Sequence, residues 1–186
     1  MSKLVVSEFV TVDGVFEDPG GGEGSPYGGW AFQFERGPEG DRFKLDELMA
    51  AGALLLGRVT YEGFAAAWPK MGDSNPFAEK FNEMPKYVVS STLQEPEWNN
   101  STLIEVDRVA ALKDEVEGDL LVNGSGQLAR ALAERGLVDE YRLMVYPIVL
   151  GQGKRLFDGL GMSRRLRLVS SEPAGETIIL TFAAEA

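Results

Sequence analysis

The 186-residue sequence contains no cysteine and no histidine. Without cysteine there are no disulfides and no thiolate nucleophile. Without histidine there is neither a Ser-His-Asp triad nor a His-ligated metal site, and we expect no metal centre. General acid–base chemistry must therefore come from Asp, Glu, Tyr, Lys, water or a cofactor.

Long apolar runs and a basic surface are also missing. No apolar run reaches the roughly 20 residues that span a bilayer, and the first apolar stretch breaks at Ser7-Glu8, too early for a signal peptide. The net charge of −11 opposes the binding of nucleic acid, whose phosphates require a basic surface. We therefore expect a cytoplasmic protein that binds a small molecule, and neither membranes nor nucleic acid.

The composition is that of a globular protein, with 44% apolar and 25% charged residues. A chain of this length suits one domain, and we expect residues 1–186 to form it. Strand and helix patterns alternate as far as Gly136, and only strand patterns follow. This order predicts an α/β fold of three layers (α/β/α) with a mixed, mainly parallel sheet and antiparallel C-terminal strands.

Apolar periodicity and turn residues predict the individual elements. Strands are expected at residues 3–12, 53–56, 86–90, 103–106, 120–122, 141–149, 165–171 and 177–183. Helices are expected at residues 39–51, 60–67, 76–84, 107–116 and 127–135. Gly52 is expected to end the first helix as a C-cap residue. The glycine-rich residues 19–29 form either a functional lid or an ordinary surface loop.

Two strand-to-helix turns carry glycine, and the first lies at Gly57. The apolar residues 53–56 lead through it into a helix that begins near Arg58. A helix N-terminus presents unpaired N–H groups and partial positive charge, and a guanidinium suits phosphate oxygens. The alternative is an ordinary turn with a solvated arginine.

The second turn, residues 123–126, has the sequence Asn-Gly-Ser-Gly. Its G-x-G-x-x-A pattern is like a Rossmann fingerprint, but Asp139-Glu140 comes too soon and precedes its strand, where the fingerprint needs an acid after a parallel strand. Ligands of α/β sheets bind at the carboxyl ends of strands. The two turns together therefore predict one crevice that binds the phosphates of a dinucleotide.

Several motifs follow one another in order along the chain. They lie at residues 11–14 (TVDG), 56–62 (LGRVTYE), 86–93 (KYVVSSTL), 123–126 (NGSG), 139–141 (DEY), 147–153 (PIVLGQG) and 156–157 (LF). This set resembles the dihydrofolate-reductase-like superfamily, and within it the reductase domain of riboflavin biosynthesis. The zinc deaminase motif of the bifunctional riboflavin proteins needs His and Cys, which this sequence lacks.

The resemblance implies a homodimeric reductase that uses NADPH to reduce a small planar heterocycle, as 5-amino-6-(5-phosphoribosylamino)uracil reductase does. Its implied cofactor-binding residues are Gly57, Arg58, Val59, Thr60, Ser90, Ser91, Thr92, Asn123, Gly124, Ser125, Gly126 and Gln127. The first turn would hold the 2′-phosphate and part of the diphosphate, and the second would meet the diphosphate with backbone donors. Relatives often carry arginine where Ser91 stands, so a preference for NADPH over NADH depends on Arg58.

The catalytic and substrate-binding residues are less sharply defined. The resemblance points to Asp13, which follows the first strand, and to Asp41, found by counting back from the Gly-Arg turn. Asp13 is alternatively a turn former, and Asp41 a solvated helix residue. The implied substrate-binding residues are Trp30, Tyr61, Pro147, Gly151, Gly153 and Lys154. The aromatic rings can equally belong to the core, and the loop can be a solvated hairpin tip.

Two other functions stay open at this point. The chain can be a non-catalytic, homodimeric nucleotide-binding module that keeps the phosphate turns but lacks a proton donor. It can also be a true dihydrofolate reductase, against which the weak match of the substrate helix argues.

Overall fold

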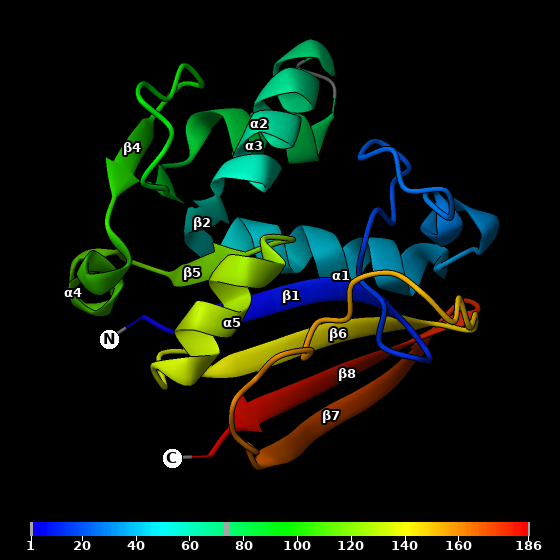
Figure 1. Ribbon diagram of the computed structural model, residues 1–186. Coiled ribbons are helices and arrows are strands. Elements are labelled where there is room, and N and C mark those ends of the chain that lie inside the picture. The colour runs from blue at the N-terminus through cyan, green and yellow to red at the C-terminus, as the bar shows by residue number, and fades with distance from the viewer. Residues whose placement is uncertain (1, 73–74, 186) are drawn as a thin grey trace.

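An eight-stranded sheet organises the chain. The computed structural model describes residues 2–72 and 75–185, and their strands follow the order β4-β3-β2-β5-β1-β6-β8-β7 (Figure 1). The strands are β1 (Leu4–Thr11), β2 (Ala51–Gly57), β3 (Lys86–Val89), β4 (Ser101–Ile104), β5 (Asp119–Val122), β6 (Glu140–Tyr146), β7 (Leu166–Ala174) and β8 (Thr177–Ala184). Neighbouring strands from β4 to β6 are parallel, whereas β8 and β7 are antiparallel to their neighbours.

Helices cover both faces of this sheet. They are α1 (Gly37–Ala50), α2 (Arg58–Ala67), α3 (Pro76–Glu83), α4 (Val109–Glu115) and α5 (Gly126–Glu134), with 3₁₀ turns at Trp30–Gln33, Trp68–Lys70 and Val106–Arg108. Successive residues of β1 face opposite sides. Val6 packs in a cluster with Leu112 and Leu132 of α4 and α5, whereas Val5 packs in one with Leu48 of α1 and with residues of α2 and α3.

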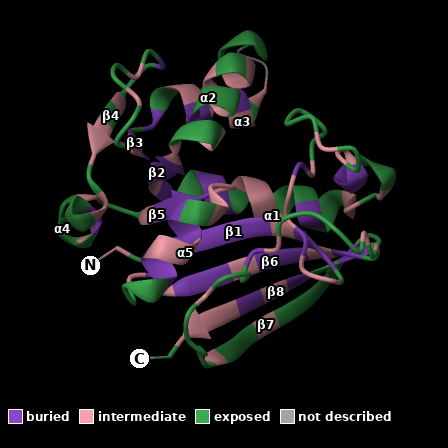
Figure 2. Ribbon diagram, in the orientation of Figure 1, coloured by how far each residue is buried: buried purple, intermediate pink, exposed green. Residues whose placement is uncertain are grey.

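The predicted three-layer fold with a mixed sheet and antiparallel C-terminal strands is thus confirmed. Buried residues concentrate in the central strands, and the outer strand β7 is largely exposed (Figure 2). The predicted elements are all present, and their bounds differ by a few residues. No helix within the described residues combines the length and the apolar character needed to cross a bilayer.

The prediction that Gly52 ends the first helix as a C-cap is wrong. Helix α1 ends at Ala50, and Ala51 is already extended (φ −71°, ψ 132°), so Gly52 lies inside β2. A Cβ atom at Gly52 would lie 1.9 Å from the carbonyl oxygen of Glu117. Glycine is required here because the backbone before β5 passes too close for any side chain.

Candidate nucleotide-binding site

The two glycine-bearing turns meet at one edge of the sheet. They follow β2 and β5, which are parallel neighbours, so both leave the sheet at the carboxyl ends of strands. The Gly57 N–H donates to Ser125 Oγ at 2.9 Å, and the Ser125 N–H donates to Thr60 Oγ1 at 2.9 Å. A Cβ atom at Gly124 would lie 3.0 Å from the Thr60 side chain. The turns therefore touch and form one continuous rim.

This rim is made of two helix N-termini. Helix α2 begins at Arg58 and α5 at Gly126, and no side chain of the described residues caps either start. The first N–H groups of an uncapped helix lack a partner within the helix, and the helix dipole favours an anion there. The turn into α5 is tight because Gly124 (φ +61°) and Ser125 (φ +58°) both adopt left-handed backbone. The geometry suits a phosphate-bearing ligand.

Arg58 adds a cation to the rim. Its side chain is 44% exposed, and Nη1 lies 3.1 Å from Oε1 of Glu62, one helical turn further on. An exposed pair of this kind is worth only a few tenths of a kcal/mol. The guanidinium can therefore exchange Glu62 for a phosphate oxygen at little cost. Val59, beside it, is 64% exposed.

The segment after β3 extends the same edge. Val89, the last residue of β3, is the register partner of Gly57 in β2, so Ser90, Ser91 and Thr92 leave the sheet beside the first turn. The Ser90 hydroxyl accepts the N–H of Thr92 at 3.1 Å, which folds the segment into a local turn. Asn123 and Gln127 belong to the second turn and the start of α5. The structure thus brings all twelve residues of the implied cofactor set to one edge.

Asp13 holds a neighbouring loop in place. Its carboxylate accepts the Thr11 hydroxyl (2.6 Å), the N–H groups of Leu150 (3.2 Å) and Gly151 (2.9 Å), and Nη2 of Arg155 (3.3 Å). The Thr11 hydroxyl, and then the two backbone N–H groups, lower the pKa of Asp13 to about 2. Both carboxylate oxygens are occupied, which supports the turn-forming alternative for Asp13 over a proton donor.

We expect Asp13→Asn to lower the thermal unfolding midpoint by ~3 °C at pH 7, through the loss of about one charge-assisted contact. Folding lowers the pKa of Asp13 from 3.8 to about 2. The ionised carboxylate therefore stabilises the fold fully above the unfolded-state pKa of 3.8, and this stabilisation is lost as the pH falls towards about 2. Thermal unfolding followed by circular dichroism across this window measures the difference. If Asp13→Asn lowers the unfolding midpoint as much at the acid end of this window as at pH 7, the ionised carboxylate has no stabilising role. Asp41→Asn serves as the exposed control.

Asp41 lies on the surface of α1. Its side chain is 63% exposed, and Oδ1 accepts Nε of Arg36 at 2.5 Å. The guanidinium of Arg36 in turn stands 5.6 Å from the centroid of the Phe9 ring. Asp41 is therefore a solvated helix residue, the alternative that the sequence analysis left open, and it is not buried beside a ligand site.

Two of the implied substrate-binding residues belong to the core. Trp30 is fully buried, with its indole N–H donating to the carbonyl of Glu17 (2.9 Å) and its ring against Tyr146. Tyr61 is 3% exposed, and its hydroxyl accepts the backbone N–H of Trp98 (2.8 Å). Both rings thus follow the alternative of core packing, and neither is open to a heterocycle in this arrangement.

The remaining implied substrate residues lie on the loop after β6. Pro147, Gly151, Gly153 and Lys154 are all exposed. The Lys154 ammonium pairs with Oε1 of Glu17 at 2.6 Å while the side chain stays 71% exposed. The loop is thus an exposed tip whose lysine already has a partner within the chain.

The glycine-rich loop is folded around a buried aspartate. The Asp18 carboxylate, 2% exposed, accepts the N–H groups of Glu23 and Ser25, each at 3.0 Å, and its carbonyl accepts that of Gly29 at 2.9 Å. A Cβ atom at Gly28 would lie 2.2 Å from the same carboxylate. The glycines therefore let the backbone wrap tightly around one side chain.

Sequence analysis missed one residue of this edge, Glu8. It lies in β1, is 6% exposed, and its Oε1 has no hydrogen-bond partner among the described residues. Burial raises the pKa of Glu8 well above its usual range. The signal was present in the sequence as a charged residue that interrupts an apolar strand.

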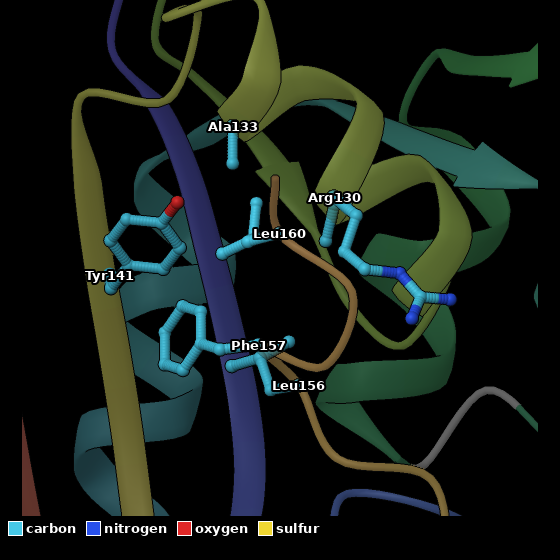
Figure 3. A pocket seen from close by; sticks show the side chains of 7 residues that line it. Arg130, Ala133, Tyr141, Leu156, Phe157 and Leu160 are labelled. Carbon is cyan, nitrogen blue, oxygen red and sulfur yellow. The ribbon is translucent and has the colours of Figure 1, made fainter. Parts of the chain in front are cut away.

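Two depressions lie away from the rim, and the first is too small to hold a water molecule. One lies between α5, β6 and the loop after it, where Tyr141, Leu156, Phe157 and Leu160 converge and the Arg130 guanidinium points outward (Figure 3). The other is an open groove beside Lys3 and Gly118, at the amino ends of the strands. Neither contains a residue of the implied nucleotide site.

The sheet order and the paired turns define a dihydrofolate reductase-like fold. The model of the RibD C-terminal domain matches residues 2–180, and the chain belongs to that family. Family members are NADPH-dependent reductases that bind NADP(H).

The chain is also similar to individual proteins in sequence or in fold. "Uncharacterized protein YyaP" of Bacillus subtilis is 29% identical over 140 residues, which cover 72% of this chain and 74% of YyaP. The crystal structure of "Putative riboflavin biosynthesis protein" from Shewanella sp. PV-4 has a TM-score of 0.76 at 20% identity and full coverage of both chains. Enterococcus faecalis dihydrofolate reductase, complexed with NADP(H), has a TM-score of 0.59 at 16% identity, covering 99% of this chain and 97% of its own. The two structural likenesses concern the fold.

Proposed function

We propose that this protein is an NADPH-dependent reductase that delivers hydride to a small planar heterocycle. The observation that carries the proposal is the contact between two uncapped helix N-termini at the carboxyl edge of the sheet, through Gly57, Thr60 and Ser125. Family membership supports the reaction type, and the resemblance of the sequence motifs to the reductase domain of riboflavin biosynthesis supports the class of substrate.

Different residues of the rim suit different phosphate groups of NADPH. The N–H groups at the start of α2, together with the Arg58 guanidinium, suit the 2′-phosphate and part of the diphosphate. The Ser125 N–H is already bonded to Thr60, so the N–H groups of Gly126 and Gln127, at the uncapped start of α5, suit the rest of the diphosphate. When bound, NADPH supplies the hydride, so the chain's own task is to position the cofactor and the substrate and to manage protons.

A non-catalytic nucleotide-binding module is the second candidate. The observation that favours it is the state of the two expected acids. Asp13 is engaged by the loop that it anchors, and Asp41 by Arg36 at the surface. Each carboxyl group would have to give up these partners before it could act on a ligand.

The two candidates separate in one set of measurements. Titration of the protein with NADPH, followed by cofactor fluorescence, measures binding. Steady oxidation of NADPH with a panel of pterins, pyrimidines and quinones then measures turnover. Binding with turnover supports the reductase, binding without any turnover supports the module, and no binding contradicts both. Strong thermal stabilisation by methotrexate would instead favour a dihydrofolate reductase.

The oligomeric state is also a proposal. A homodimer is expected from the family resemblance and from the prevalence of twofold assemblies. Light scattering coupled to size exclusion measures the mass directly, and a monomeric mass at micromolar concentration would contradict it.

A further inference from the structure

Glu8 lies directly beneath the second turn. In β1, Val6 pairs with Val122, the last residue of β5, so Glu8 stands where β5 has ended and the chain turns at Asn123. The Asn123 amide donates to the carbonyl of Ser7 at 2.9 Å, which ties this turn to β1 at the same level. Strand alternation places Glu8 on the face of Val6, towards α5.

The surroundings of Glu8 disfavour a carboxylate. Burial is the largest influence and raises the pKa of Glu8. A backbone hydrogen bond from Gly124 and the charge of Lys44 in α1 lower this pKa, whereas the charges of Glu47 in α1 and Glu23 in the glycine-rich loop raise it. Lys44 is itself committed to Glu47, with Nζ and Oε1 at 2.6 Å. No described residue provides Oε1 of Glu8 with a hydrogen-bond donor. An ionised group in this position would thus lack both a solvent shell and a committed counter-ion.

A bound nucleotide would add to this effect. The rim formed by the turns at Gly57 and Gly124 attracts anions, and the diphosphate would bring negative charge to the turn directly above Glu8. Like charges that approach one another in a region of low dielectric repel strongly. A carboxylic acid avoids that repulsion, and its hydroxyl can donate a hydrogen bond.

We propose that Glu8 is a neutral carboxylic acid in the nucleotide-bound protein, and that its proton allows the rim to accept a diphosphate. Glu8 is thus a positioning residue beneath the cofactor. The inference rests on the proposed binding of NADPH at this rim.

Glu8→Gln tests the inference, because glutamine keeps the shape of the acid and cannot ionise. Glu23→Gln is the matched control, since Glu23 is the other nearby acid whose pKa is raised by burial. Infrared spectra of the NADPH complexes at pH 7 report the carbonyl stretch of a protonated carboxylic acid. The spectrum of each variant is subtracted from that of the wild type. We expect this band in the wild type and in Glu23→Gln, and we expect it to be lost in Glu8→Gln. NADPH titration should give Glu8→Gln a Kd within about threefold of the wild type.

Three results would overturn the inference: a wild-type complex without the band, a band that survives in Glu8→Gln, or a folded Glu8→Gln that binds NADPH more than about tenfold weaker. If Glu8→Gln does not fold, carbon-13 labelling of the glutamate carboxyl groups in Glu23→Gln replaces it. A band that does not shift with the label then overturns the inference. Wild-type protein that fails to bind NADPH contradicts the proposed function itself, whereas binding without the band contradicts only the role of Glu8.

Discussion

Replacing Gly52 with alanine is expected to destabilise the fold by about 3 kcal/mol or more, the cost of forcing atoms into a fully packed region. The new Cβ would lie 1.9 Å from the carbonyl oxygen of Glu117 and 2.8 Å from its carbonyl carbon. Both partners are backbone, so no side chain can rotate away. The crowding is mutual, because a Cβ at Gly118 would lie 2.8 Å from the carbonyl oxygen of Ala50. Relief requires β2 and β5 to separate at their amino ends.

Urea and thermal unfolding, followed by circular dichroism, measure this effect. Gly63→Ala is the matched control, because Gly63 lies in the exposed middle of α2 and a Cβ there meets nothing within 4 Å. That change is expected to stabilise the protein by roughly 0.5–1 kcal/mol through helix propensity. If Gly52→Ala is as stable as the wild type, the segment before β5 must be able to move away from the new side chain. The experiment also bears on the site, since β2 and β5 carry its two turns.

Local features of the fold were readable from the sequence because they depend on neighbouring residues. The apolar runs at 53–56 and 120–122 are typical of buried parallel strands, and each leads through glycine into a helix. The presence of two phosphate-type turns followed from these patterns. That both turns face one crevice was predicted from where ligands bind in α/β sheets. Their direct contact was not predicted, because it requires β2 and β5 to be neighbours although α2, α3, β3, β4 and α4 separate them in the chain.

Other residues could not be interpreted without the partners that folding provides. Gly52 reads as a helix stop until the backbone of Glu117 is placed beside it. Pro173 reads as a turn residue, yet it lies within β7, where an edge strand tolerates a residue without an N–H group. Glu47 lies on α1 and is of a residue type that is seldom buried, but it is 5% exposed and paired with Lys44.

The candidate site shows the same division between local and distant information. Helix starts, glycines and Arg58 are local signals, and the structure gathers them at one edge. The side chains expected to act on substrate depend on distant contacts. Asp13 is engaged by residues after β6, and Trp30 is buried against Tyr146. Glu8 is an acid whose pKa is raised by burial, and the other influences on it come from the turn before α5 and from charges on α1 and the glycine-rich loop.

Arg58→Ala is expected to weaken NADPH binding by roughly 10- to 100-fold, the loss of one charge-assisted contact of about 1–3 kcal/mol. The wild-type guanidinium stands at the start of α2, and its pair with Glu62 is exposed on both sides (44% and 48%). Trading one exposed partner for a 2′-phosphate dianion should favour the phosphate. NADH lacks that group, so its affinity should fall much less. Fluorescence titration of each protein with both cofactors measures the two losses.

Two further variants make this result specific. Glu62→Gln frees the guanidinium and should tighten NADPH binding by about twofold, in line with the small strength of an exposed pair. Arg135 is comparably exposed, pairs with Asp107 and follows the C-terminal end of α5, far from the rim. Arg135→Ala should therefore leave the affinities for NADPH and NADH unchanged. Equal losses of NADPH and NADH in Arg58→Ala would mean that the guanidinium contacts the shared diphosphate. Discrimination between the cofactors would then have to come from Ser90, Ser91 and Thr92 after β3, a segment that offers hydroxyl groups but no second cation.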